Sequence, residues 1–179
     1  MARTPSRTRT AIRCCSMARS SHCLSRRPLV ASRRTADTAL VLPPSARELI
    51  LSGTALAHMT TLNPDGSPQV SVVWAGLDGD RIITGHFGRY RKITNLLRDP
   101  RIALSFVGPT PLPNGMHPNL VVYGTAEISD GGAAELVGRL AKVYIAPDFD
   151  YPMPPGPPPG HVITTTVRRI AGVGPWMDA

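Results

Sequence analysis

Two strand-like segments separated by a dense turn constrain most strongly how this chain can fold. Residues 54–62, TALAHMTTL, and residues 69–76, QVSVVWAG, are rich in apolar and β-branched side chains. The intervening NPDGSP combines an Asn-Pro pair, which presets a turn, with an Asp-Gly pair that tolerates positive φ. The pattern predicts a β-hairpin. A second turn, LDGD, leads into the strand-like RIITGHF at 81–87, so a second hairpin is predicted to follow.

The remainder of the chain adds three strand-like segments and a few short helices. The strands are predicted at 101–107, 120–128 and 161–173, and the helices at 45–51, 89–98 and 130–145. Six short strands with hairpin turns argue for a closed antiparallel barrel. The expected fold class is therefore mainly β (α+β), a six-stranded antiparallel β-barrel with a few short helices. A stiff, extended connector with seven prolines, residues 146–160, is expected before the last strand.

The strand at 69–76 has few polar residues on either of its faces. One alternating set is Val70, Val72 and Trp74, and the other is Ser71, Val73 and Ala75. A strand of this kind is expected to be covered on both sides, for example by a barrel interior and by a subunit or a ligand.

The basic character of the chain belongs to its first residues. The formal net charge is +8, yet residues 1–36 carry nine arginines and no acid, so the remaining eleven cations and twelve acids give −1. We therefore divide the chain into a disordered basic tail, 1–38, and a single domain, 39–179. Three interpretations of the tail are open. It is a disordered extension, a segment added by a mis-called start with Met17 as a candidate for the true start, or a transit-like segment. Nucleic-acid binding, the fourth reading, rests on this tail alone.

Several classes of function are excluded or disfavoured by what the sequence lacks. All three cysteines, Cys14, Cys15 and Cys23, lie in the tail, so the domain has no catalytic thiol and no cysteine-ligated metal. Its histidines show no metal-site spacing, and we expect no metal. No glycine-rich nucleotide fingerprint and no GxSxG elbow is present. No secretory signal or apolar span is present either, so we expect a cytoplasmic location without a membrane partner.

The segment RYRKITNLLRDP predicts a basic helix from about Arg89 to Arg98, with an apolar stripe of Ile93, Leu96 and Leu97. Helical spacing places Arg89 and Lys92 on that stripe, one turn toward the N-terminus, pointing into a cleft at the helix start. Arg91 and Arg98 share the opposite, solvated face.

Cations in a first helical turn oppose the helix dipole, so a negative group is expected beside them. Together with the preceding strand end TGHFG, which contains Thr84, Gly85 and His86, the two inward cations are predicted to form a phosphate cradle. The alternative is that Arg89 and Lys92 pair with the domain's own carboxylates or extend into solvent.

Five segments in a fixed order carry a family resemblance. TLNPDGSPQVSVVW, DGDRIITG, GRYRKITNLLRDPRIALSF, VVYGTAEI and a C-terminal GPW resemble the flavin/deazaflavin oxidoreductase family. These are split β-barrel proteins, often called pyridoxamine-phosphate-oxidase-like, and the resemblance is to their coenzyme F420-dependent reductases. It covers roughly residues 45–176. It implies a homodimer with two cofactors in clefts between the subunits.

The resemblance also implies roles for particular residues. Lys92 would hold the cofactor's phosphate, with Arg89, Asn95 and Thr84 as helpers. Trp176 would reach the partner subunit's site, and Asp99 with Arg101 would form a structural corner. The candidates for the ring and substrate face are Gln69, Val70, Ser71, Val72 and Trp74.

The expected function is an F420H2-dependent oxidoreductase that transfers a hydride from a reduced deazaflavin to a small unsaturated organic acceptor. Tyr123, His86 and His58 are candidate proton donors by residue type, and a solvent proton would serve equally. One alternative is an oxidoreductase with FMN as its cofactor. Another is a protein that binds a flavin, deazaflavin or tetrapyrrole without turnover.

Overall fold

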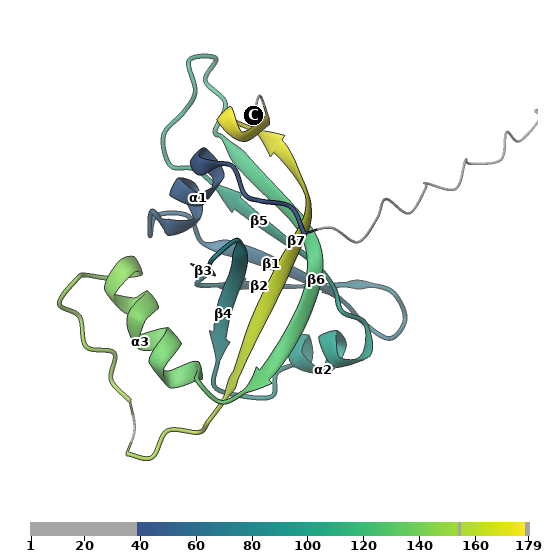
Figure 1. Cartoon of the computed structure of the whole chain (residues 1–179), viewed down its shortest axis with the longest axis vertical. Coiled ribbons are helices and arrows are strands. Elements are labelled where there is room, and N and C mark those ends of the chain that lie inside the picture. The colour runs from purple at the N-terminus through teal and green to yellow at the C-terminus, as the bar shows by residue number, and fades with distance from the viewer. Residues whose placement is uncertain (1–38, 154, 178–179) are drawn as a thin grey trace, which may run out of the picture. The chain divides into compact units, whose positions relative to one another are not determined.

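Seven antiparallel strands and three α-helices make up the described part of the chain, residues 39–153 and 155–177 of a computed structural model (Figure 1). The basic tail predicted for residues 1–38 lies outside the described residues. The helices are α1 (Pro44–Leu51), α2 (Arg91–Arg98) and α3 (Ala133–Tyr144), with a 3₁₀ turn η1 at Pro175–Met177. The strands are β1 (Ala57–Leu62), β2 (Pro68–Val73), β3 (Gly76–Asp78), β4 (Arg81–His86), β5 (Arg101–Val107), β6 (Asn119–Asp130) and β7 (His161–Val173).

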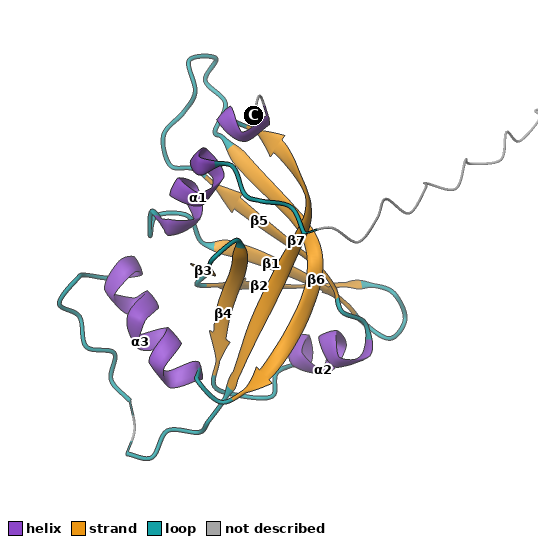
Figure 2. Ribbon diagram, viewed as in Figure 1, coloured by secondary structure: helices purple, strands orange, loops and turns teal. Residues whose placement is uncertain are grey.

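The strands form one strongly curved sheet in the order β2-β1-β5-β6-β7-β4-β3 (Figure 2). Its two edge strands, β2 and β3, are consecutive in the chain and joined only by Trp74 and Ala75. Three Cα steps of about 3.8 Å keep these two strand ends within about 11 Å of each other, so the edges meet at this corner. No ladder joins β2 to β3 in the described residues.

The prediction of a six-stranded closed barrel is therefore wrong in its strand count and in its closure. The segment 69–76 was expected to be one strand, but the ladder with β1 ends at Val73 and a new strand, β3, pairs with β4 from Gly76. A three-residue strand is too short to show a period of two in the sequence. The mainly antiparallel β architecture and the three helices agree with expectation.

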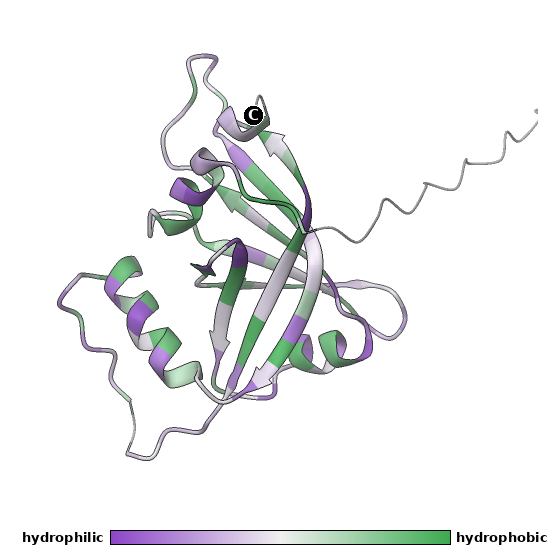
Figure 3. Ribbon diagram, in the orientation of Figure 1, coloured by the Kyte–Doolittle hydropathy of each residue, from purple (hydrophilic) through white to green (hydrophobic). Residues whose placement is uncertain are grey.

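The main hydrophobic core fills the concave side of the sheet. Its largest fully buried side chains include Phe106, Leu42, Ile50, Met59, Ile82, Ile93 and Leu104. The amphipathic helix α3 packs on the other side of β4 (Figure 3). Gly85 permits this close packing, since a Cβ there would lie 3.0 Å from a methyl carbon of Val137.

The outward face of β2 is uncovered in the single chain. Val70 and Val72 are 58% and 54% exposed, although the sequence predicts cover on both faces of this strand. The physical reason is that β2 is an edge strand, which has a neighbouring strand on one side only.

Candidate functional site

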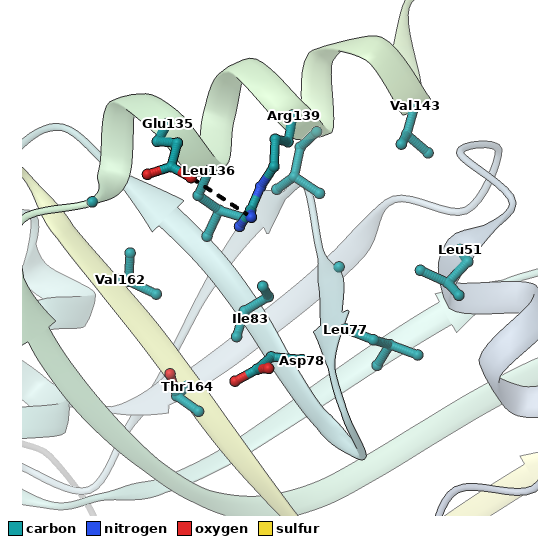
Figure 4. Close-up of a pocket in the computed structure, with 13 residues that line it drawn as sticks. Leu51, Leu77, Asp78, Ile83, Glu135, Leu136, Arg139, Val143, Val162 and Thr164 are labelled. Carbon is teal, nitrogen blue, oxygen red and sulfur yellow. Dashed lines mark ion pairs between the residues drawn. The ribbon is translucent and has the colours of Figure 1, made fainter. Parts of the chain in front are cut away.

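Several pockets border α3, and the first offers little for chemistry. It has a volume of about 550 Å³ and lies between α3 and strands β3, β4 and β7. Figure 4 shows Arg139 leaning toward Glu135 above an apolar floor that includes Ile83. That pair is 3.8 Å apart, and Asp78 on the rim pairs with Arg81 at 2.6 Å. The charges around this pocket are therefore already compensated.

The second pocket has a volume of about 470 Å³ and is built from segments far apart in the sequence. Strand β2, the end of β4, the start of α2, helix α3 and the connector after α3 all contribute to it. We call it the Lys92 pocket. Its lining includes Val72, Trp74, His86, Tyr90, Lys92 and Tyr151. None of the described residues that line it carries a carboxylate.

Lys92 is a half-buried cation without a countercharge. Its Nζ donates a hydrogen bond to Ser71 Oγ at 3.2 Å and lies 5.2 Å from the centroid of the Tyr90 ring. No ion pair to Lys92 is formed within the described residues. Burial lowers the pKa of Lys92. Helix α2 has no acid in its first turn and no side-chain cap, so this end of the pocket is prepared for an anion.

His86 lies at the base of the pocket and is only 5% exposed. Burial, followed by the nearby charges of Lys92 and His161, lowers the pKa of His86 from its usual 6.5 to about 4. The imidazole is therefore neutral at pH 7. Its Nε2 is 2.9 Å from Oγ1 of Thr84. Thr84 is buried and does not line the pocket, whereas Gly85 does.

Asn95 is committed to a structural network. This residue is 2% exposed, and its Nδ2 donates to Thr61 Oγ1 at 3.1 Å and to Asn63 Oδ1 at 3.2 Å. Thr61 in turn donates to Gln69 Oε1 at 2.9 Å. Asn95 and Gln69 are thus both hydrogen-bonded to Thr61, and this network fixes α2 to the β1–β2 hairpin.

Arg89 is not brought together with Lys92. Helix α2 begins at Arg91, so the helical spacing that was predicted to align the two cations does not include Arg89. Arg89 is exposed and lines a separate depression beside His161. Leu97, predicted on the buried stripe, is 59% exposed, and the buried polar Asn95 takes part of that face.

The remaining candidates lie away from the Lys92 pocket. Trp176 is 4% exposed in the core of its own chain. Tyr123 lies on the outward sheet face with the Arg169 guanidinium 3.8 Å from its ring centroid, and His58 is exposed on β1. Asp99 and Arg101 form the expected corner, with a 2.6 Å ion pair. Arg98 is exposed and donates to the Leu62 carbonyl.

Sequence reasoning named Trp74 but missed the other aromatic residues around the pocket. Five of the chain's nine aromatic residues gather in or directly beside it: Trp74, Phe87, Tyr90, Tyr144 and Tyr151. They come from four parts of the chain, because only Phe87 and Tyr90 share a loop, so local spacing does not reveal the whole group. The scarcity of aromatic residues elsewhere in the chain was the one available signal.

No cluster of three or more side chains suited to a metal ion occurs among the described residues. Within that same part of the chain, no helix combines the length and apolarity needed to cross a bilayer.

Comparison with solved structures finds proteins of the same fold. An F420 reductase is 25% identical, with a TM-score of 0.56, over 69% of this chain and 94% of that one. A heme binding protein from Mycobacterium smegmatis is also 25% identical, with a TM-score of 0.51, over 75% of this chain and 56% of that one. An FMN-binding protein from Syntrophomonas wolfei is 16% identical, with a TM-score of 0.52, over 72% and 84% of the two chains, and shows the fold alone.

A comparison with curated protein sequences found no significant match. The sequence profile of the family described as Pyridoxamine 5'-phosphate oxidase matches residues 42–174, which span all seven strands. The chain belongs to the pyridoxamine 5'-phosphate oxidase family.

Proposed function

We propose that this chain is a cytoplasmic oxidoreductase that binds a phosphate-bearing flavin-type cofactor in the Lys92 pocket. The preferred cofactor is coenzyme F420, and FMN is the alternative. When bound and reduced, the cofactor supplies a hydride to a small unsaturated organic acceptor. The observation that carries this proposal is the uncompensated charge of Lys92 in a pocket whose described lining has no carboxylate.

The residues around Lys92 fit a cofactor of this kind. The ammonium group and the Ser71 hydroxyl lie 3.2 Å apart and can share one phosphate oxygen as two donors. Val72 and Trp74 continue along the same segment and offer an apolar surface to a ring. The neutral imidazole of His86 can donate or accept one hydrogen bond at the base of the pocket. His86 is thus the candidate proton donor that lies in the pocket, whereas Tyr123 does not line it.

The preference for F420 rests on similarity to the F420 reductase, which this chain matches over 94% of that protein's length at 25% identity. The site's chemistry does not separate the two cofactors, because both carry a phosphate.

A homodimer is part of the proposal. The outward face of the edge strand β2, with Val70 and Val72 more than half exposed, is an apolar surface beside the Lys92 pocket. A second copy of the chain would cover this surface and complete the pocket wall.

A non-catalytic binding protein is the second candidate. Similarity to the heme binding protein, also at 25% identity, favours this candidate. Its ligand would be a flavin, a deazaflavin or a tetrapyrrole. Tight binding without hydride transfer to enones, quinones or biliverdin-like acceptors would favour this candidate over the enzyme.

The test is a fluorescence titration of F420 and of FMN into the wild type and Lys92→Ala. Arg91→Ala is the matched control, because it removes a neighbouring cation that is exposed and does not line the pocket. We expect Lys92→Ala to lose at least tenfold in affinity for the true cofactor, since a charge-assisted hydrogen bond contributes about 1.5–3 kcal/mol. Unchanged affinity for both cofactors in Lys92→Ala would refute the proposal.

A further inference from the structure

The proline-rich connector between α3 and β7 is held at both of its ends (Figure 2). It starts where α3 ends at Tyr144, and at its far end the Gly131 amide donates to the Gly160 carbonyl at 2.9 Å. Gly160 has a φ of +62°, and a Cβ there would lie 2.5 Å from the His86 carbonyl oxygen. The far end of the connector is thus fixed beside the end of β4, and the prolines among its described residues restrict the segment between the two ends.

Tyr151, in the middle of this connector, reaches across one side of the Lys92 pocket. Its ring centroid lies 6.1 Å from that of Trp74 in an edge-on arrangement with an interplanar angle of 85°. It lies 6.1 Å from the ring of Phe87, at 27°. Trp74 follows β2 and Phe87 follows β4, so Tyr151 joins two separate segments into one aromatic wall.

Contacts with Tyr144 hold Trp74 in place. The ring of Tyr144 stacks on it with the centroids 5.5 Å apart and the planes 9° from parallel. The Tyr144 hydroxyl accepts a hydrogen bond from the Ala75 amide at 3.2 Å and lies 3.1 Å from the Ala75 carbonyl oxygen as a donor. The aromatic wall is therefore set by contacts within the protein before any ligand arrives.

The wall and the cation lie beside different residues of the segment 71–74. Ser71 contacts Lys92, and Trp74 follows three residues later, which corresponds to about 10 Å along an extended chain. A ligand that satisfies both ends carries an anionic group at one end and a flat apolar ring at the other. Aromatic rings prefer edge-on or offset-stacked partners, so the wall favours a flat conjugated ring over a saturated one.

We propose that Tyr151 is a specificity-determining residue, which makes the aromatic end of the Lys92 pocket selective for a flat conjugated ring. This inference rests on the proposed function, because Lys92 as the phosphate anchor defines the other end. The ring is that of the cofactor or that of the acceptor. A preformed wall on a proline-restricted connector lowers the entropy lost on binding.

Binding is measured by isothermal titration calorimetry with probes that separate the two ends of the pocket. Riboflavin and 5-deazariboflavin present the cofactor-type ring without phosphate, ribose 5-phosphate presents the phosphate without the ring, and menadione stands for a flat acceptor. The variants are Tyr151→Ala, Tyr151→Phe and the control Phe149→Ala. Phe149 is an aromatic residue of the same connector that does not line the Lys92 pocket.

We expect Tyr151→Ala to bind the ring probes roughly three- to tenfold more weakly, as for the loss of one aromatic contact. Its affinity for ribose 5-phosphate stays unchanged, and Tyr151→Phe and Phe149→Ala bind every probe as the wild type does. If Tyr151→Ala binds riboflavin and 5-deazariboflavin more weakly, the ring that Tyr151 contacts is that of the cofactor. If only the binding of menadione is weaker, the ring is that of the acceptor.

Wild-type affinity of Tyr151→Ala for all ring probes, or no ring binding by the unaltered chain, overturns the inference. A different variant tests the proposed function itself. That function fails if Lys92→Ala binds FMN, F420 and ribose 5-phosphate as tightly as the wild type does. A circular dichroism spectrum that matches the wild type confirms that each variant folds.

Discussion

The buried amide of Asn95 should stabilise both the fold and the position of Lys92. Replacing it with alanine removes two hydrogen bonds, to Thr61 at 3.1 Å and to Asn63 at 3.2 Å. Each neutral hydrogen bond contributes about 0.5–1.5 kcal/mol net, so Asn95→Ala should lower the free energy of unfolding by about 1–3 kcal/mol. The loss stays within this range because Thr61 still donates to Gln69 at 2.9 Å.

The assay is urea unfolding followed by circular dichroism, with Thr94→Ala as the matched control. Thr94 is exposed on the same helix, so its replacement should change the free energy of unfolding by no more than about 0.5 kcal/mol. Asn95→Asp keeps the shape of the side chain but replaces both donors with a buried carboxylate facing the Asn63 oxygen. It should therefore be less stable than Asn95→Ala at pH 7, and its deficit relative to the wild type should narrow as the pH falls and the carboxylate is protonated.

A loss below about 0.5 kcal/mol for Asn95→Ala, with an unchanged dependence on urea concentration, would refute the reasoning. It would mean that water replaces the amide at no net cost and that α2 is held by the apolar contacts of Ile93 and Leu96 alone. Equal stability of Asn95→Asp and Asn95→Ala at pH 7 would also contradict it.

Two further predictions concern charge in the Lys92 pocket. Lys92→Met should raise the melting temperature at pH 7 and weaken phosphate binding. It removes a half-buried cation, and burial lowers the pKa of that cation. A lower melting temperature in calorimetry would show that the ammonium group is compensated in the free protein. The lowered pKa of His86, about 4, means that the unfolded chain binds more protons between about pH 6.5 and 4, so stability should fall as the pH falls through this range. For the wild type, the free energy of unfolding should fall by up to about 3 kcal/mol over this range because of His86. In His86→Asn this fall should be absent from urea unfolding curves recorded at pH 7, 5.5 and 4. An unchanged fall would assign it to other groups.

Periodic and turn-forming segments of the sequence predicted most of the secondary structure. The turn NPDGSP stands between β1 and β2 as expected, and its Asp65 caps the turn through the Ser67 amide at 3.0 Å. The long strands β6 and β7 are rich in apolar and β-branched side chains, and they were predicted over residues 120–128 and 161–173. Strand β3 was missed because three residues are held by pairing with β4 rather than by any local preference.

The candidate site was predicted only in part, for a physical reason. Lys92 was identified from helical spacing and from the family resemblance, and Trp74 from the resemblance; the structure places both in one pocket. Arg89 was grouped with Lys92 on the assumption of two additional helical residues, which the chain does not form before Arg91. Tyr151 was not identified, since its neighbours Trp74 and Phe87 are more than sixty residues away in the chain.

The sequence by itself determined the antiparallel β class, the confinement of the basic charge to the first residues and the cation at the start of α2. These properties follow from local preferences and from composition, which one stretch of chain expresses without its partners. The tertiary structure decided which cation lies beside a pocket, which buried amide serves as a brace, and which aromatic rings meet. Each of these depends on how far the sheet curls and where the connector lies, and those are set by packing between segments distant in sequence.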